Sequence, residues 1–193
     1  MIRRAALVVA VFLLAACSTT KDAVETGQEF TFVAPGGQTT ILYDPPASRG
    51  TLRALSGESL LAPGTTTGLE ALPGRVVVLN IWGSWCGPCR AEASDLQFVA
   101  QQTAADGVSV LGVDVRDDRA AATDFVRDRA ITYDSVFDPP ARTLVALKGY
   151  PRNTVPSTIV LDRQHRVAAV YLTSIRVTEL IPLVQRLAAE PAP

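Results

Sequence analysis

The sequence has few of the side chains that bind metal ions. Its 193 residues include three cysteines, one histidine and one methionine. Cys86 and Cys89 form a Cys-x-x-Cys pair, and the only other cysteine and histidine are Cys17 and His165. A zinc site would need further cysteine or histidine ligands beside the pair, and a copper site would also need additional methionine, histidine or cysteine ligands. A copper-holding protein is therefore the least favoured alternative, and we expect no metal or other cofactor.

The chain has no strong excess of charge of either sign and no hydrophobic run long enough to span a membrane. Lysine and arginine total 18, aspartate and glutamate total 19, and the net charge is −1. Such a balance does not indicate nucleic acid or an anionic membrane surface as a partner. The apolar run at residues 5–16 is too short to cross a hydrocarbon core of ~30 Å as a helix.

The first residues instead have the organisation of an export signal. Arg3 and Arg4 precede the apolar run, which ends in Leu-Ala-Ala-Cys at Cys17. This pattern fits a signal peptide and resembles the lipobox of bacterial lipoproteins, in which the cysteine is lipidated. We predict a lipoprotein signal peptide at residues 1–16 and a tether at 17–29, with the protein anchored to the outer face of the bacterial cell membrane. The alternative is an ordinary cleaved signal in which Cys17 is incidental.

The Cys-x-x-Cys pair lies between a predicted strand and a predicted helix. Residues 76–82 are an apolar run rich in β-branched side chains, which is typical of a strand buried on both faces. Leu96 and Val99 continue a helical pattern after the pair. A helix N-terminus stabilises a thiolate, so we predict Cys86 at the exposed helix end as the nucleophile and Cys89 as the resolving thiol. A purely structural disulfide would gain little by closing so short a loop.

The string Trp-Cys-Gly-Pro-Cys at residues 85–89 is the signature of the thioredoxin superfamily. From about residue 69 to 189 the chain resembles the extracytoplasmic branch of TlpA-, ResA- and CcsX-like proteins. The resemblance implies a thioredoxin-like α/β fold with a central mixed sheet flanked by helices, a thiol–disulfide oxidoreductase activity, and Trp85 beside the reacting sulfurs. The residues before Cys86 do not match the Pro-x-x-x-Thr-x-x-Cys pattern of peroxiredoxins.

We divide the rest of the chain into an N-terminal extension at residues 30–67 and a thioredoxin-like domain at 68–190. In the extension, residues 30–33 and 39–43 flank Pro-Gly-Gly and predict a β-hairpin. The charge run at residues 116–119 has the composition of a solvated loop. The remaining predicted elements are strands at 108–115, 159–162 and 166–171, helices at 119–130 and 178–189, and a short helix from Asp138 to near Gly149.

Pro156 precedes the predicted strand at residues 159–162. Thioredoxin-like folds carry a cis-proline just ahead of this strand, beside the active-site pair, and Pro156 matches that position. A cis peptide bond at proline turns the chain sharply. It would leave the backbone of Val155 free to pair with an extended client segment. The alternative is an ordinary trans proline in a loop.

The resolving cysteine needs a proton acceptor. Thioredoxins carry a buried aspartate on the central strand, and that position is Asn80 here, which cannot accept the proton. Glu92 lies three residues after Cys89, so both can share one helix face. ResA-like proteins resemble this sequence in carrying Cys-x-x-Cys-x-x-Glu, which implies proton transfer by Glu92. The alternative is an exposed acid that is favourable near a helix N-terminus.

The family resemblance implies that the protein reduces disulfides outside the cytoplasm. The client would be the Cys-x-x-Cys-His motif of apocytochromes c, which must be reduced before haem is attached. Electrons would come from a membrane thiol carrier of the CcdA or DsbD type. Gly87 stands where strong oxidants often carry a histidine, which favours the reductase. The alternative is a DsbE/DsbF-like oxidase that forms disulfides in secreted proteins.

Overall fold

The computed structural model describes residues 28–33, 35–52 and 54–191. The predicted signal peptide, the lipidated Cys17 and almost all of the tether lie outside these residues. Within the described ranges, no helix combines the length and the apolar character needed to cross a bilayer.

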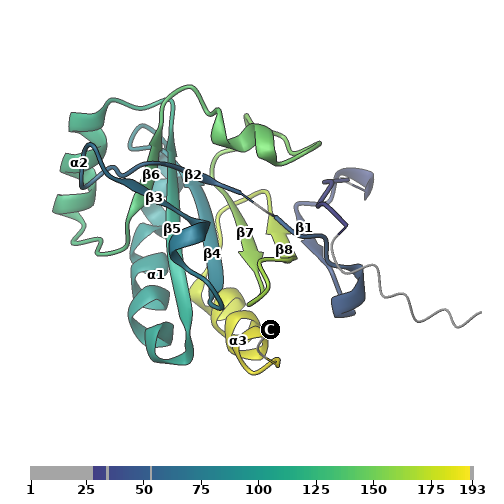
Figure 1. Ribbon diagram of the computed structural model, residues 1–193. Helices are drawn as coiled ribbons and strands as arrows, with labels where there is room; N and C mark the ends of the chain where they lie inside the picture. Colours follow the sequence, from purple (N-terminus) through teal and green to yellow (C-terminus); the bar gives the residue numbers. More distant parts are fainter. Residues whose placement is uncertain (1–27, 34, 53, 192–193) are drawn as a thin grey trace, which may run out of the picture.

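The central sheet of the described chain has six strands in the order β1-β8-β7-β4-β5-β6 (Figure 1). The central strand β4 runs parallel to β5 and antiparallel to β7, so the sheet is mixed, as expected. A separate antiparallel pair, β2 and β3, lies across the front of the view in Figure 1. The bounds are β1 Thr40–Leu42, β2 Ser56–Glu58, β3 Thr66–Gly68, β4 Val76–Trp82, β5 Val108–Val115, β6 Ser135–Asp138, β7 Ser157–Leu161 and β8 Val167–Tyr171.

Three α-helices occur in the described residues, α1 at Gly87–Thr103, α2 at Arg119–Asp128 and α3 at Val177–Ala188. The helices α1 and α3 cover the same face of the sheet, where apolar side chains of β4 and both helices form one buried cluster. This cluster includes Val76, Val78, Leu96, Val99, Leu180, Val184 and Leu187. Short 3-10 helices are η1 Pro35–Gly37, η2 Pro46–Ser48, η3 Leu69–Ala71, η4 Ala104–Asp106 and η5 Thr143–Ala146.

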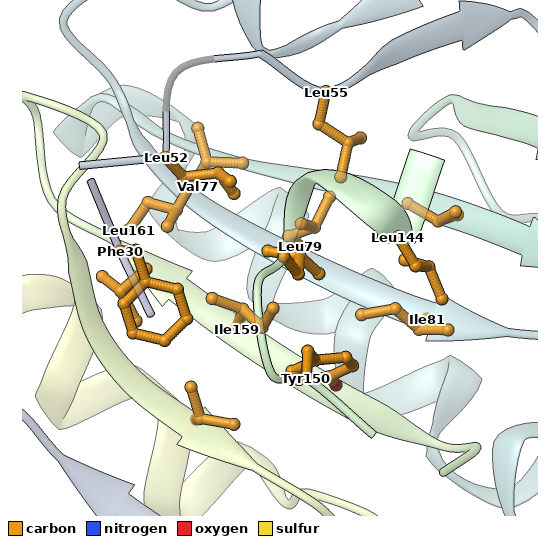
Figure 2. Packing of buried hydrophobic residues seen from close by; sticks show 14 of the residues in the cluster. Phe30, Leu52, Leu55, Val77, Leu79, Ile81, Leu144, Tyr150, Ile159 and Leu161 are labelled. Carbon is orange, nitrogen blue, oxygen red and sulfur yellow. The ribbon is translucent and has the colours of Figure 1, made fainter. Parts of the chain in front are cut away.

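The N-terminal extension covers the opposite face of the sheet. Alternate residues of β4 point into a second buried cluster, which Figure 2 shows from close by. The cluster contains Val77, Leu79 and Ile81 of β4, Phe30, Leu52 and Leu55 of the extension, and Leu144 and Tyr150 from the segment before β7. All residues of β4 are buried, which confirms the strand predicted from its continuous apolar run.

The two segments predicted to form a β-hairpin, residues 30–33 and 39–43, pair with other parts of the chain and not with each other. The strand β1 adds to the sheet edge beside β8, and Phe30 N and Phe32 N donate to the carbonyls of Thr51 and Lys148. Phe30 and Phe32 are buried in the core, and their segment does not pair with β1. The Phe30 and Tyr43 rings nevertheless contact each other edge to face. The extension does contain an antiparallel pair, which β2 and β3 form instead.

The segment around Asp138 also differs from the prediction of a helix that reaches Gly149. Asp138 ends the short strand β6, which pairs with β5. Its carboxylate then accepts hydrogen bonds from the backbone N–H groups of Arg142 and Thr143, at 3.0 and 2.7 Å. The turn of helix that follows is the 3-10 helix η5. Asp138 is therefore not the N-cap that the sequence predicted, because Arg142 directly precedes η5, but its carboxylate still satisfies two backbone N–H groups at the start of that turn.

A buried arginine joins the extension to the rest of the molecule. The Arg49 side chain is fully buried and contacts Asp162 at 3.0 Å and Glu190 at 2.6 Å. Its other guanidinium nitrogen contacts Asp44 at 2.9 Å. Asp162 follows β7 and Glu190 follows α3, so this ion-pair network ties three distant segments together.

Candidate active site

The two cysteines lie at the junction between β4 and α1, as predicted. Cys86 is the N-cap of α1, and its Sγ accepts a hydrogen bond from Cys89 N at 3.2 Å. The pair forms a disulfide with the Cα atoms 5.3 Å apart. The turn before it is compact, because Cys86 N donates to the Gly83 carbonyl at 3.1 Å.

The disulfide is more covered than the prediction of an exposed Cys86 implies. Cys86 is 4% exposed and Cys89 is 2% exposed. Both lie in an apolar cluster with Trp82 and Val155, and this packing covers the sulfurs. Trp85, directly before the pair, is 51% exposed. Trp85 therefore offers the large apolar surface next to the disulfide.

Glu92 points into the protein rather than into solvent. It is 3% exposed, and its Oε1 and Oε2 accept hydrogen bonds from Asn80 Nδ2 at 2.9 Å and from Ile175 N at 3.0 Å. Burial raises the pKa of Glu92 to about 7; the two hydrogen bonds lower it, and the nearby charge of Asp95 raises it further. The alternative of an exposed helix acid is therefore wrong. A carboxyl with this pKa can accept and return a proton near neutral pH.

Asn80 connects Glu92 to the space beside Cys89. Its Nδ2 also donates to Thr158 Oγ1 at 3.2 Å, which holds the amide in place. Asn80 and Cys89 both line a small cavity of about 10 Å³, together with Tyr133 and several apolar side chains. That volume is about the size of one water site. Sequence reasoning identified Asn80 as a missing acid and did not foresee this linking role.

Pro156 lies beside the end of the central strand. The Val155–Pro156 peptide bond is cis, as expected. The proline precedes β7, whose first residues Ser157 and Thr158 pair with Ile81 and Asn80 of β4. Val155 is half-buried and packs against the apolar cluster that contains both cysteines. The cis-proline segment and the disulfide are thus neighbours at one end of the sheet.

The loop between β5 and α2 holds the turn that carries Trp85. Ser84 donates from its backbone N and, at 2.8 Å, from its Oγ to the Asp117 carboxylate. Trp85 Nε1 donates to the Val115 carbonyl at 3.1 Å, and the Arg116 guanidinium lies 5.1 Å from the Trp85 ring centroid. Sequence reasoning missed this contact, because a run of charged residues has the same composition whether it is solvated or packed on another loop.

His165 lies elsewhere. Its Nε2 is 3.0 Å from the Leu72 carbonyl oxygen, and the residue follows β7 in the turn to β8. In the part of the chain that the structure describes, no group of three or more histidine, cysteine, aspartate or glutamate side chains is placed to hold a metal ion.

Comparison with protein families places this site in a known group. The model of the AhpC/TSA family matches residues 54–170. The chain belongs to the AhpC/TSA family. The match includes Trp85, both cysteines of the pair, Glu92 and Pro156. Membership and the observed sheet confirm the predicted thioredoxin-like fold.

Individual relatives in this family carry names from disulfide exchange. The chain is 31% identical to the thiol:disulfide interchange protein DsbE of Pseudomonas aeruginosa over 125 residues, which are 62% of this chain and 66% of the relative. The chain thus spans slightly less than two thirds of that curated relative.

Two solved structures are similar over most of this chain. A secreted thiol-disulfide isomerase from Corynebacterium glutamicum has 42% identity and a TM-score of 0.82, and the similarity covers 85% of this chain and all of the other. A DsbF homologue from Corynebacterium diphtheriae has 43% identity and a TM-score of 0.77, with 82% and 99% covered. These similarities confirm the resemblance to extracytoplasmic thioredoxin-like proteins.

Proposed function

We propose that this protein is a thiol–disulfide oxidoreductase that acts on protein disulfides outside the cytoplasm. The observation that carries the proposal is the Cys86–Cys89 disulfide at the N-terminus of α1, one helical turn before the buried Glu92. In the reduced protein, the Cys86 thiolate attacks a client disulfide and forms a mixed disulfide, releasing one client thiolate. Cys89 then attacks Cys86 Sγ and releases the second. Two electrons pass to the client, and the protein returns to the disulfide form.

The position of Cys86 favours its thiolate. As the N-cap of α1, Cys86 lies at the positive end of the helix dipole, and its Sγ accepts the N–H of Cys89. These interactions stabilise negative charge on Cys86 rather than on Cys89. Cys86 is accordingly the attacking thiol, and Cys89, one turn further along the chain, resolves the intermediate.

Glu92 is the proton acceptor for Cys89. Its carboxyl is held by Asn80, and Asn80 shares the water-sized cavity with Cys89. We therefore assign the proton of the Cys89 thiol to Glu92, which lies one helical turn further along α1. Because the pKa of Glu92 is about 7, the same carboxyl can pass the proton on to solvent at neutral pH.

The client docks on Trp85 and the cis-proline segment. Trp85 is half-exposed and offers apolar surface beside the disulfide. The backbone of Val155, next to the cis peptide bond at Pro156, can pair with an extended client strand. Together they place a client disulfide against Cys86.

We assign the direction of transfer as reduction, with the Cys-x-x-Cys-His motif of apocytochrome c as client and a CcdA- or DsbD-type membrane carrier as electron donor. An ionised Glu92 near Cys89 disfavours the thiolate and hence the reduced pair, which makes the protein a better reductant. The proposal includes lipid anchoring through Cys17, so Cys17→Ala should move the protein from the membrane to the soluble fraction.

A DsbF-like oxidase is the second candidate. The identity of 43% to a DsbF homologue and of 42% to a secreted thiol-disulfide isomerase favours it. In that case the oxidised pair would accept electrons from the thiols of secreted proteins. The chemistry at Cys86 and Cys89 would be the same, run in the opposite direction.

Mixing experiments with purified protein test the proposal. Reduced protein is mixed with an oxidised Cys-x-x-Cys-His peptide, oxidised protein is mixed with a reduced unfolded secreted protein, and Cys86→Ser is the control. The reductase predicts that most of the peptide becomes reduced, through Cys86. Electron transfer only in the second mixture would show that the protein is an oxidase and not a reductase. The absence of Cys86-dependent transfer in both mixtures would exclude both proposed functions.

A further inference from the structure

Asp114 is a buried acid that the exchange chemistry above does not use. It lies on β5 with 0% exposure. Neither oxygen of its carboxyl accepts a hydrogen bond from any donor in the described chain. Its partners in register are Trp82 on β4 and Phe137 on β6, which carry no charge. The Trp82 Nε1–H is already donated to Ser135 Oγ at 3.1 Å, so it is not available to Asp114.

Two charged side chains face Asp114. Asp117, from the loop after β5, carries a charge of the same sign and is within hydrogen-bonding reach of the Asp114 carboxyl. Arg119, from α2, carries the opposite charge. Its guanidinium is occupied by the carbonyls of Ser59 and Leu60 and lies 4.0 Å from the centre of the Phe137 ring. An ionised Asp114 would therefore be a buried charge without a dedicated partner, which is strongly unfavourable.

A protonated Asp114 is neutral and avoids the cost of a buried, unpaired charge. Burial, followed by the charge of Asp117 and a hydrogen bond to it, raises the pKa of Asp114 to about 8, while Arg119 lowers it. A neutral carboxyl has one O–H donor, and the Asp117 carboxylate is the acceptor within reach. Asp114 therefore holds its proton at neutral pH and can donate it in a hydrogen bond to Asp117.

Asp117 in turn holds the turn that carries the reactive disulfide. Its carboxylate accepts both the backbone N–H and the Oγ–H of Ser84. Ser84 precedes Trp85 and Cys86, and the Trp85 indole is held by the carbonyl of Val115, the last residue of β5. Asp117 is thus one of the contacts that hold residues 83–86 in place.

We propose that Asp114 is a positioning residue that, as a neutral acid, donates a hydrogen bond to Asp117 and so keeps Ser84 and the active-site turn in place. When Asp114 loses its proton to solvent, two carboxylates face each other and their repulsion moves Asp117 away from Ser84. The turn is then released at alkaline pH. The effect on catalysis rests on the proposed exchange function, whereas the coupling between the two acids does not.

The coupling can be measured in the oxidised protein, whose disulfide sulfurs do not titrate. Tryptophan fluorescence is followed from pH 6 to 9.5, because Trp82 is next to Asp114 in register and Trp85 contacts Val115, the residue after Asp114. Glu92→Gln serves as the background, because it removes the other buried acid that titrates in this range, at about 7. The expected result is a fluorescence transition with a midpoint near pH 8 that is lost in Glu92→Gln/Asp114→Asn. No transition in the background protein, or its persistence in the double variant, would overturn the proposal.

Asp117→Asn provides a second variant if Asp114→Asn does not fold. Removing the neighbouring negative charge should raise the acid dissociation constant of Asp114 about tenfold, which lowers the midpoint of the fluorescence transition by about one pH unit. An unchanged midpoint would overturn the coupling.

The rate of disulfide exchange, measured over the same pH range, separates the two proposals. Loss of an alkaline fall in rate on Asp114→Asn substitution would link the coupling to exchange, and an unchanged rate profile would overturn that link. A fluorescence transition with no exchange at any pH would contradict the proposed function and leave the acid pair intact.

Discussion

Asn80 Nδ2 lies 2.9 Å from Glu92 Oε1 and 3.2 Å from Thr158 Oγ1. The amide therefore bridges the central strand, the first helix and the strand that follows Pro156. An asparagine at this position cannot take a proton, but it holds the carboxyl of Glu92, the proposed proton acceptor. The proposed acceptor thus lies on the helix, and the strand holds it in place.

The two cysteines should have different roles. Cys86→Ala should abolish exchange, because no attacking thiolate remains. Cys89→Ala should leave the client trapped on Cys86, because the mixed disulfide cannot be resolved. A non-reducing gel after mixing with oxidised client measures both outcomes. A trapped species with Cys86→Ala, or none with Cys89→Ala, would contradict the assigned order of attack.

Glu92→Gln should slow exchange by about 100-fold, the usual scale for loss of a general acid–base group. It should also remove the inflection near pH 7 that the Glu92 pKa of about 7 places in the rate profile. Glutamine keeps the size of the side chain, so the disulfide should still form.

Asp95→Asn is the matched control for this variant. The charge of Asp95 contributes to the raised pKa of Glu92. Its removal should move the inflection to lower pH while exchange persists. If Glu92→Gln left the pH profile unchanged, Glu92 would have no part in proton transfer.

Stability should fall as pH rises from about 5 to 8. Glu92 and Asp114 have pKa values of about 7 and 8 in the folded protein, against about 4 for both in an unfolded chain. Between these values the folded state binds more protons than the unfolded state, so raising the pH favours unfolding. Each acid contributes up to about 1.4 kcal/mol per pH unit inside its window.

Urea unfolding of the oxidised protein at pH 5.5 and 8 measures this dependence. The double variant Glu92→Gln/Asp114→Asn should lose much less stability over the same interval than the unsubstituted protein. An equal loss in both proteins would show that other groups cause the dependence.

Arg49→Met should destabilise the protein by about 3 kcal/mol, the lower end for breaking a buried ion pair, because Asp162 loses its buried cation and keeps only the partly exposed Arg166, at 2.8 Å. Arg186→Ala is the control. Arg186 contacts the same Asp44 at 2.9 Å, but its side chain is 46% exposed, so its loss should cost about 1 kcal/mol or less. Urea unfolding of the two variants compares them. Similar losses of stability in the two variants would mean that the burial of Arg49 does not determine how much its ion pairs stabilise the protein.

The features that were predictable from sequence are those that local pattern determines. The continuous apolar run of β4 and the helical spacing of apolar residues in α1 place Cys86 and Cys89 correctly at the junction of the strand and the helix. The partners of β1 were not predictable in this way, because Pro-Gly-Gly is a local turn signal whereas the edge of β8 lies about 130 residues further along the chain.

The acidic residues of the site also divide into those that the sequence pattern identifies and those that only the structure identifies. Helical spacing placed Glu92 on the face of Cys89, and the structure adds the burial that raises its pKa. Asp117 stands in the charge run at residues 116–119, which has the composition of a solvated loop, whereas Asp114 lies in the strand predicted at 108–115 and had no assigned role. The packing of that loop against Ser84 distinguishes Asp117 from a surface acid, and complete burial distinguishes Asp114.

The equilibrium reduction potential of the Cys86–Cys89 pair in the purified protein is the most direct test of the proposed reductase. Equilibration with a thiol–disulfide buffer of known potential, followed by quantifying the oxidised fraction, measures it. The reductase predicts a value near that of thioredoxin, roughly −270 mV. A value near that of DsbA, roughly −120 mV, would contradict it and identify the protein as an oxidase of secreted clients.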